Sequence, residues 1–509
     1  MKYCISYKDT DSFTKLILDY IEKDEQLKNF VSHFPEIENF EKQIKEKKTH
    51  QIERDILVDV LKDQNGSFLL SEKSKTNINL LRDDNTFSVT TGHQLCLFTG
   101  PVYFLYKIIS TINLCENLAE KYPNYNFIPI FWMASEDHDF EEINHINYIN
   151  HKIKWSTKQK GSVGRMDLGT LNHVISELKL VLGNHIGVNK LILLFEKAYL
   201  KFENLADATR FLVNELFGEY GLVIIDGDDK SLKTLFIPQI IKDTVKSAFA
   251  PIIRECSSNL SKYYKQQAFV RDINFFRLTK GKRELITGTV TENEVLNSPE
   301  TFSPNVLLRP LYQEVLLPNI AYVGGESEIS YWMQLKTVFD HEKIPFPILV
   351  LRNSVLLIDK KRHERFMKLG FKLKDLFLSK DVLNRIYLIN NSKPNISLES
   401  DKKELKSLYE NLVSKTSDSS LSDSIASQFK KQLSFLDNLQ AKLIKSEKTK
   451  NESAVNQISK IKKSLFPNNI LQERHDNYIF YYLDHGDNFI KILKQNLDPL
   501  SSNFVILII

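Results

Sequence analysis

The fold is decided by the stretch FSVTTGHQLCLFTGP, residues 87–101. β-Branched and aromatic residues run into a turn that contains glycine, and apolar residues at helical spacing follow over residues 103–118. This order predicts a strand, a loop and a helix. A second segment of this kind, FIPIFWMASEDHDFEEINHI (127–146), begins with a nearly continuous apolar run and ends in acidic residues. A strand that is apolar on both faces is typical of a parallel sheet between layers of helices.

Two further strand regions extend this pattern, GLVIIDGDD (221–229) and FPILVLRNSVLLID (346–359). The letters RNS in the second region predict a turn between two strands. Strands separated by helical stretches predict an α/β fold with a doubly wound, Rossmann-like core. We expect this core over residues 1–370, with insertions at about 147–210 and 256–310, where the sequence is mixed and polar.

Both ends of the chain are expected to pack against this core. Apolar residues at helical spacing over residues 11–62 predict helices that cover a sheet. Residues 471–509 are expected to return to the core. Their last segment, FVILII (504–509), would invite aggregation if it were exposed, so we predict that it joins the core sheet.

Residues 371–470 have a different composition, without glycine and rich in lysine, serine, leucine and asparagine. They predict an antiparallel helical hairpin or coiled-coil arm. Lysines on its outer faces indicate either a solvated surface or a basic binding face. A first stripe keeps the heptad rhythm, with Gln432 at a polar seam position, and a second follows the polar stretch 446–453. The two stripes are Ile425, Phe429, Leu436, Leu439 and Leu443, and then Val455, Ile458, Ile461 and Leu465.

Composition bounds the class of protein. The chain has 509 residues, 42% hydrophobic and 26% charged, which excludes global disorder. Lysine and arginine (68) barely exceed aspartate and glutamate (64), so no nucleic-acid partner is expected. Four scattered cysteines without a CxxC pair indicate a reducing compartment and no zinc site. No segment has the apolar length of a signal peptide or a membrane span, so we expect a soluble, cytoplasmic protein without a membrane partner.

The first candidate site is the turn after the first strand. A glycine turn at the carboxyl end of a parallel strand lets backbone N–H groups approach a phosphate. A tight turn with a surface histidine explains the same residues, because no complete phosphate-binding motif is present. The candidate ligand-binding residues are Gly92, His93, Gln94, Thr99, Gly100 and Lys107.

The second candidate site is the acidic cluster that follows the second strand. Carboxylates there could bind an amino group, ribose hydroxyls or Mg²⁺, and His138 could exchange protons near neutral pH. An acidic first turn of a helix capped by Ser135 is the structural alternative. A zinc site from His138 and His145 is disfavoured, since their spacing of seven positions does not match the usual short ligand pairs. The cluster comprises Glu136, Asp137, His138, Asp139, Glu141 and Glu142.

The third candidate site is AYVGGESEISYW (321–332), an apolar run followed by two glycines and an amphipathic helix. The glycines permit close approach to a ligand, although a simple turn explains them equally well. Upstream, Arg309 could pair a carboxylate or phosphate, or brace an internal carboxylate. The residues of this site are Gly324, Gly325, Glu326 and Glu328.

At these three segments the chain resembles the bacillithiol-biosynthesis cysteine-adding enzymes, a family of cysteine ligases. The resemblance extends to LDPL (497–500) and so covers nearly the whole chain. Two positions depart from the family pattern, His93 in place of glutamine and GGESE (324–328) in place of a GGPGE-like loop. The matching stretches are TTGHQLCLFTGPVYFLYKIISTINL, IPIFWMASEDHDFEEINHI and SPNVLLRPLYQEVLLPNIAYVGGESEISYWMQL.

The resemblance implies a Rossmann-type core similar to class I aminoacyl-tRNA synthetases and a coiled-coil domain through which the protein forms a homodimer. It also implies addition of cysteine to glucosaminyl-malate, the last step toward bacillithiol. ATP or another nucleotide would then activate the cysteine carboxylate, and Mg²⁺ is a further candidate cofactor. The alternatives are a nucleotide-dependent amide ligase or nucleotidyltransferase that acts on another amine, and a non-enzymatic dimeric scaffold with a relic nucleotide pocket.

On this hypothesis the catalytic residues are His93, Lys107, His138 and Asp139. Gly92, His93 and Gln94 would position phosphate, with electrostatic help from Lys107. The acidic cluster would bind an amine or ribose. Gly324 and Gly325 would line the side of the pocket that binds the nucleotide.

Overall fold

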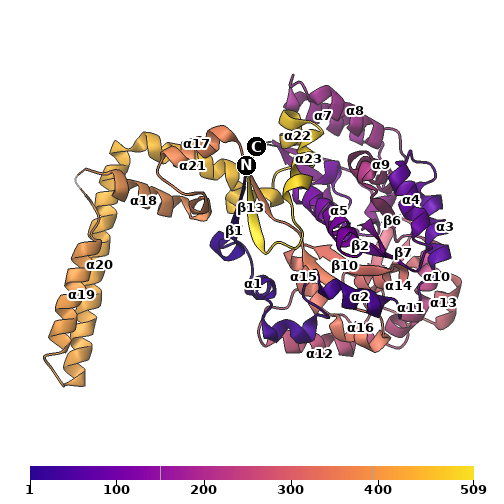
Figure 1. Cartoon of the computed structure of the whole chain (residues 1–509), viewed down its shortest axis with the longest axis horizontal. Helices are drawn as coiled ribbons and strands as arrows, with labels where there is room; N and C mark the ends of the chain where they lie inside the picture. The colour runs from indigo at the N-terminus through magenta and orange to yellow at the C-terminus, as the bar shows by residue number, and fades with distance from the viewer. Residues whose placement is uncertain (149–150, 394) are drawn as a thin grey trace.

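The computed structural model describes residues 1–148, 151–393 and 395–509 and centres on a sheet of five parallel strands (Figure 1). The expected strands are therefore confirmed, and a strand before the two glycines of the third candidate site joins them. The central sheet consists of β2 (Thr86–His93), β3 (Asn126–Met133), β6 (Val223–Asp226), β10 (Asn319–Gly324) and β11 (Ile348–Leu351).

The order of these strands explains where a ligand can bind. The order of strands in the sheet is β6-β3-β2-β10-β11. The chain first adds β3 and β6 on one side of β2, and then adds β10 and β11 on its other side. This is the strand order of a doubly wound Rossmann-like sheet, whose ligands bind at the carboxyl ends of the strands where the order reverses. The reversal falls between β2 and β10, each of which ends at a predicted glycine turn.

Helices cover both faces of the central sheet because successive residues of its buried strands point to opposite sides. In β3, Phe131 and Met133 belong to one apolar core, and Ile130 and Trp132 belong to the other. The first core is closed by α5 (Tyr103–Lys121), α7 (Leu171–Leu182), α8 (Val188–Tyr199), α9 (Leu205–Phe217), α22 (Ile479–His485) and α23 (Asn488–Asn496). The second is closed by α1 (Lys15–Ile21), α3 (Arg54–Asn65), α10 (Lys230–Leu235), α11 (Ile237–Thr244), α12 (Phe249–Ser261), α14 (Arg309–Leu316), α15 (Glu326–Met333) and α16 (Lys336–Glu342).

The expected N-terminal helices are present, and α2 (Asn39–Lys47) and α4 (Glu72–Leu80) complete them. The regions predicted as insertions contain small sheets of their own. A hairpin of β4 (His145–Tyr148) and β5 (His151–Lys154) lies in the first. The second holds β7 (Phe275–Thr279), β8 (Lys282–Leu285), α13 (Glu292–Asn297) and β9 (Phe302–Pro304). The division into domains stays a prediction.

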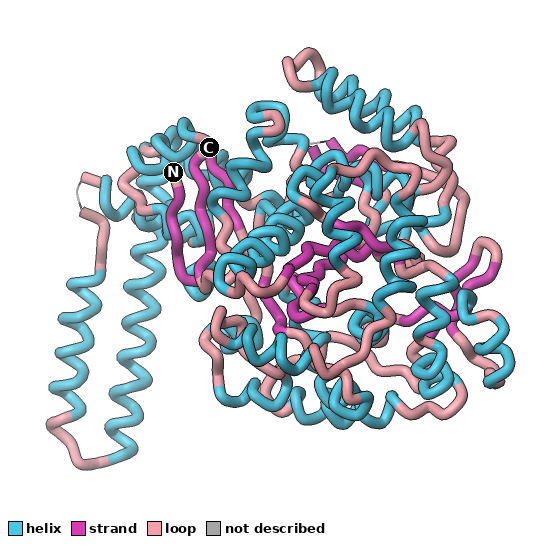
Figure 2. The backbone as a smooth tube through the Cα atoms, turned by 45° about the vertical axis from the view of Figure 1, so that its right-hand side comes forward, coloured by secondary structure: helices cyan, strands magenta, loops and turns pink. Residues whose placement is uncertain are grey.

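The two ends of the chain meet in a second sheet (Figures 1 and 2). Strand β13 (Asn503–Ile508) lies between β1 (Lys2–Ser6), to which it is antiparallel, and β12 (Val355–Ile358), to which it is parallel. The prediction that 504–509 joins the core sheet was therefore wrong, and β1 was not predicted at all. The RNS turn carries the chain from β11 into this second sheet. There β13 is the middle strand, and each of its edges is hydrogen-bonded to a neighbouring strand.

The helical arm extends away from both sheets (Figure 1). Its hairpin pairs α19 (Glu399–Val413) with α20 (Ser419–Lys450), so the polar stretch 446–453 does not form the turn. Helix α21 (Glu452–Leu465) continues α20 after a break at Asn451 and packs against α17 (Lys360–Lys368) and α18 (Lys380–Asn391).

The seam of α20 departs from the expected heptad. Its partly buried positions keep spacings of three and four residues, but Leu433 takes the place that the expected heptad gave to Gln432, so the stripe shifts by one residue there. Gln432 and Leu439, which the heptad placed in the seam, are exposed. The seam residues, which include the predicted Ile425, Phe429, Leu436 and Leu443, are Ser422, Ile425, Phe429, Leu433, Leu436, Gln440, Leu443, Ile444 and Glu447.

In the parts of the chain that the structure describes, every helix is too short or too polar to cross a membrane.

Candidate active site

The three candidate segments meet at the carboxyl edge of the central sheet. Gln94 donates to the Asp137 carboxylate from 2.8 Å, which joins the turn after β2 to the acidic cluster after β3. Lys107, one helical turn into α5, donates to the Gly92 carbonyl oxygen and, from 2.6 Å, to Glu328 in the turn after β10. Three regions that are far apart in the sequence therefore form one polar site at the reversal point of the sheet.

The centre of this site is the ion pair between Lys107 and Glu328. Glu328 also accepts hydrogen bonds from the Gly325 amide at 2.8 Å and the Tyr322 hydroxyl at 2.6 Å. Burial alone would raise the pKa of Glu328, but the Lys107 charge and these hydrogen bonds outweigh it and lower the pKa to about 2. Lys107 is thus engaged by protein groups, and it holds the two glycine turns in register.

Two buried arginines present donors without protein partners next to the glycine turns. Arg309 donates to the Tyr331 hydroxyl at 2.6 Å, while its Nη1 has no partner among the described residues. A Cβ at Gly92 would lie 3.3 Å from that nitrogen. Arg352 likewise has an unpartnered Nε, 3.8 Å from where a Cβ of Gly325 would stand. Buried donors are rarely left unpaired, so both guanidinium groups point to an anionic ligand beside the turns.

Arg352 was missed by the sequence analysis. It lies in the RNS turn between β11 and β12, and its backbone amide donates to the Gly324 carbonyl oxygen at 2.8 Å. Its Nη2 donates to Glu473, also from 2.8 Å, so the C-terminal segment fixes this arginine at the site. The signal available in the sequence was a charged residue inside an otherwise apolar run.

His93 is held as a neutral imidazole. Burial is the main cause that lowers its pKa to about 4, and the neighbouring Lys107 charge lowers it further. Its Nδ1 lies 2.9 Å from the Gln94 carbonyl oxygen, a contact that is satisfied when Nδ1 carries the proton. Nε2 is then a hydrogen-bond acceptor, and the neutral ring supplies no positive charge to a phosphate.

Glu136 is covered by a lysine that the sequence did not reveal. Lys233, in α10, donates to Glu136 at 2.5 Å and lies 3.5 Å from Asp228. Asp228 also forms a two-pronged ion pair with Arg165 at 2.7 Å on both arms. The carboxylates at this end of the sheet are thus balanced by cations from other elements.

The rest of the acidic cluster forms a capped turn. Asp139, and not Ser135, caps the short helix α6 (Phe140–Ile143), while Ser135 donates to Asp226 instead, so the capping alternative named the wrong residue. His138 accepts from Arg283 of β8 at 3.0 Å. Burial opposes ionisation of Asp137, but hydrogen bonds, the Gln94 one first, and the Arg283 charge lower its pKa.

These contacts bear on the suggestion that the cluster holds Mg²⁺. Glu136 binds Lys233, Asp137 binds Gln94, and Glu141 binds Lys154. A magnesium ion needs oxygen ligands that are not already committed to cations or N–H groups. Among the described residues, no group of three or more metal-ligating side chains converges. The donor set does not fit a resident metal, and we derive no step through one.

Two predicted residues, Gly100 and Glu326, are bound by protein groups. Thr99 and Gly100 belong to a buried loop whose Gly100 carbonyl oxygen accepts from Asn477 at 2.5 Å, while the Thr99 hydroxyl has no partner among the described residues. Glu326 accepts from the Thr14 amide at 2.7 Å and from Arg474 at 2.9 Å. The structure thus gives this loop and Glu326 contacts with the N- and C-terminal segments, and their predicted ligand contacts stay predictions.

The sheet order, the polar site at its reversal point and the helical arm define a Rossmann-like α/β protein with a coiled-coil domain. The chain belongs to the bacillithiol biosynthesis BshC family: the profile of its N-terminal Rossmann-like domain matches residues 1–353, and that of its C-terminal coiled-coil domain matches residues 355–509. The predicted family and fold are confirmed. The likeness to aminoacyl-tRNA synthetases stays a prediction.

Relatives named "Putative cysteine ligase BshC" resemble the chain over almost its full length. The one from Flavobacterium psychrophilum is 44% identical and the one from Flavobacterium johnsoniae 43%, each over 99% of both chains. A third, from Christiangramia forsetii, is 42% identical over 99% of this chain and 98% of its own. These relatives carry the name of a ligase, a class of enzyme that forms bonds.

Proposed function

We propose that the chain adds cysteine to glucosaminyl-malate, the last step of bacillithiol synthesis. The reaction joins the cysteine carboxyl group to the glucosamine amine, so one carboxylate oxygen would leave with the phosphate of an activating nucleotide, and the amine loses a proton. The observation that carries the proposal is the pair of unpartnered donors on Arg309 and Arg352 beside the two glycine turns. The name of the relatives supports the choice of cysteine.

Each residue then has a role that its contacts support. Arg309 and Arg352 bind anionic groups of the substrates, because both donors are buried and lack partners. His93 is neutral, and its Nε2 can orient the attacking amine by accepting a hydrogen bond from it. Lys107 is a positioning residue that acts through Gly92 and Glu328. Asp139 and its neighbours shape the acidic side of the site, where an amine would be favoured.

A nucleotide such as ATP would supply the activation of the carboxylate, since a free carboxylate and an amine do not condense readily. At Gly92 and Gly325 the absence of a side chain lets the guanidinium groups of Arg309 and Arg352 approach the backbone of the two turns, where a phosphate would be bound. The nucleotide would then bind at the turns after β2 and β10.

The test uses cells that lack the gene and carry wild-type or variant copies, with thiols measured by mass spectrometry. Deletion should abolish bacillithiol and accumulate glucosaminyl-malate. His93→Ala, Asp139→Ala and Arg309→Met should each restore less thiol than wild type, whereas Arg254→Met, at an exposed arginine, should restore all of it. Thermal unfolding of each purified variant shows that it folds. Unchanged thiol and precursor after deletion would overturn the function, and full activity of both His93→Ala and Asp139→Ala would overturn the site.

We further propose that the chain is a dimer through the arm. Phe435, Leu421 and Leu439 on α20 are 63%, 51% and 39% exposed, and grouped apolar side chains on a surface indicate a partner. Sedimentation velocity should give a dimer that Phe435→Glu converts to a monomer. Lys430→Glu, at an exposed position on another face of the same helix, is the control. A wild-type monomer at micromolar concentration would contradict the proposal.

A further inference from the structure

Residues 472–477 connect the arm to the candidate active site. Glu473 is fully buried, and its two carboxylate oxygens accept hydrogen bonds from Arg352 and from the Val355 amide, both at 2.8 Å. Since Arg352 stands beside the turn after β10, this contact brings the next residue of the segment, Arg474, to the same turn. The segment therefore places a third arginine at the site, which was not predicted from the sequence.

Arg474 differs from the other two arginines in its exposure and in its partner. Its side chain is 38% exposed, and its Nη2 donates to the Glu326 carboxylate at 2.9 Å. Glu326 directly follows Gly325, the residue beside the unpartnered Nε of Arg352. An ion pair at this exposure contributes little stability, because water screens the two charges. Arg474 is thus held next to the turn after β10 by a weak contact.

The Tyr103 ring lies close to both Arg352 and Arg474. The guanidinium carbon of Arg352 is 4.8 Å from the centre of this ring. Burial raises the pKa of the Tyr103 hydroxyl, while the positive charges of Arg352 and Arg474 both lower it. Two arginines from different segments therefore act on one hydroxyl group. An anion beside that hydroxyl would meet both charges, and the hydroxyl could donate to it.

Glu326 is held from its other side by the N-terminal segment. Its Oε1 accepts from the Thr14 amide at 2.7 Å, and its Oε2 accepts from Arg474. Its side chain is only 13% exposed, so the more exposed partner of the pair is the arginine, whose side chain is long and flexible. The carboxylate can therefore keep its place through Thr14 when the guanidinium moves to another anion.

We propose that Arg474 is a third anion-binding residue of the candidate active site, and that Glu326 is a latch that holds it until an anion binds. The inference rests on the proposed function in that it places an anion beside Arg309 and Arg352. A guanidinium group pairs with phosphate and with carboxylate alike. The anion is therefore either the phosphate of the nucleotide or the malate part of the sugar acceptor.

The experiment titrates the full-length protein in a calorimeter with inorganic pyrophosphate and, separately, with L-malate. Arg474→Met should weaken binding of the recognised anion roughly tenfold or more, the loss expected for a hydrogen bond between charged groups. Glu326→Gln keeps an oxygen for the Thr14 amide but removes the competing charge, so it should tighten binding about two- to fivefold. In the Arg474→Met background, Glu326→Gln should change nothing. The anion that shows this pattern identifies the source.

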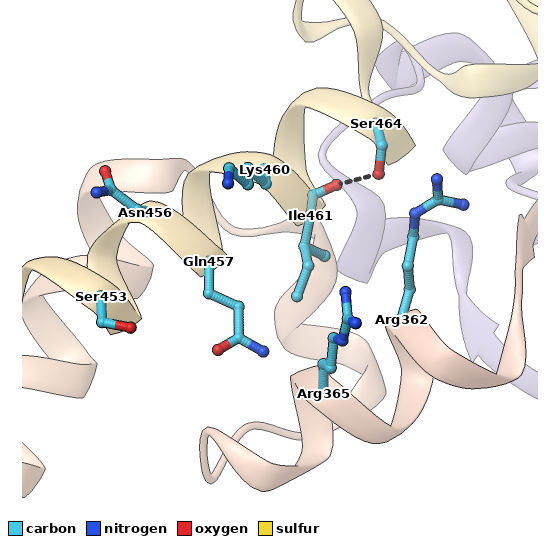
Figure 3. Close-up of a pocket in the computed structure, with 8 residues that line it drawn as sticks. All are labelled: Arg362, Arg365, Ser453, Asn456, Gln457, Lys460, Ile461 and Ser464. Carbon is cyan, nitrogen blue, oxygen red and sulfur yellow. Dashed lines mark hydrogen bonds between the residues drawn. The ribbon is translucent and has the colours of Figure 1, made fainter.

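Two controls locate the measured heat. Asp272→Asn removes the carboxylate that pairs with the exposed Arg254, and it should leave both titrations unchanged. Anions could also gather in a cavity of about 640 Å³ at the base of the arm, where Arg362 and Arg365 rise from α17 toward α21 (Figure 3). Heat from that cavity would fall in Arg365→Glu and persist in Arg474→Met, so the two positions are distinguished.

Three results would overturn the proposal. The first is that neither anion binds, in the wild type or in Glu326→Gln. The second is that Arg474→Met leaves both titrations unchanged, since Arg474 would then not contact the anion. The third is that Glu326→Gln weakens binding, or tightens it equally with and without Arg474, because Glu326 would then act on the ligand and not on the arginine. Thermal unfolding checks that each variant folds.

The proposed function is tested separately by the thiol measurement in cells. Unchanged thiols after deletion of the gene, together with the expected titrations, would reject cysteine addition and retain the latch. Loss of bacillithiol after deletion, together with titrations that ignore Arg474, would retain the function and reject the latch.

Discussion

The candidate active site and the arm are stabilised in opposite ways. At the site, Lys107 is 4% exposed and Glu328 is 23% exposed, and each is bound by groups from distant elements. In the arm, every residue of α19 is at least partly exposed, and its seam against α20 is narrow. The centre of the site is therefore held by the paired charges of Lys107 and Glu328, while the arm belongs to the less stable part of the molecule.

The largest effect should come from breaking the buried pair. Lys107→Met leaves Glu328 without its cation, and removal of one partner of a buried pair costs about 3–5 kcal/mol. We expect urea denaturation to show a loss of this size in the free energy of unfolding. Lys45→Met, which breaks a surface pair with Glu41, should leave the denaturation curve unchanged. Equal curves for the two variants would show that the pair contributes no more than a surface contact.

The residues of this pair were predicted, but their partnership was not. Strand ends and glycine turns appear in the sequence as apolar runs followed by Gly92 and Gly324, so the site could be located. Which cation meets which carboxylate depends on tertiary placement, and nothing in the sequence connects Lys233 with Glu136. The same limit applies to the two arginines of the site. Arg309 was predicted from its sequence motif, whereas Arg352 was identified only from its place in the structure.

The second sheet and the arm show the limits of periodicity. Strand β1 is mostly exposed, so its sequence lacks the apolar run that identified the others. The final strand was recognised, but only pairing partners decide which sheet a strand enters. In α20 the residues Gln432 and Leu433 are neighbours, and a strict heptad places Gln432 in the seam where the structure places Leu433. A shift of one residue keeps the spacing of three and four residues, so the sequence alone did not reveal it.

Acid should weaken the site before it weakens the arm. The folded pKa of Glu328, about 2, lies below its ordinary value of 4.5. A depressed carboxyl pKa contributes stability that is present above the ordinary value and lost as pH falls through the folded one. Between pH 4.5 and 2 the loss from this group amounts to about 3 kcal/mol at most. Unfolding measured across that window should fall steeply in wild type and less in Glu328→Gln. Identical slopes would refute the assignment.

A smaller effect should show which of two neighbouring residues lies in the seam of the arm. Leu433 is half-buried in this seam, so Leu433→Ala should destabilise the hairpin by about 1–2 kcal/mol. Gln432→Ala, at an exposed position, should change stability by less than about 0.5 kcal/mol. Hydrogen exchange of α19 and α20 measures local opening without unfolding the core. Faster exchange in Gln432→Ala than in Leu433→Ala would show that Gln432 lies in the seam, as the heptad predicted.

The smallest effect on stability is expected from a substitution at Phe435. This substitution tests whether the exposed face of the arm binds a second chain. The ring of Phe435 is 63% exposed, so Phe435→Ala removes little buried area within one chain and should change the unfolding of a dilute monomer by less than about 0.5 kcal/mol. If the arm pairs with a second arm through this face, the same substitution lowers the unfolding temperature only at concentrations where the wild type is a dimer. Thermal unfolding over a range of protein concentrations distinguishes the cases. A loss that is equal at all concentrations would mean that Phe435 packs within its own hairpin, and the exposed side of the arm would then have no role in association.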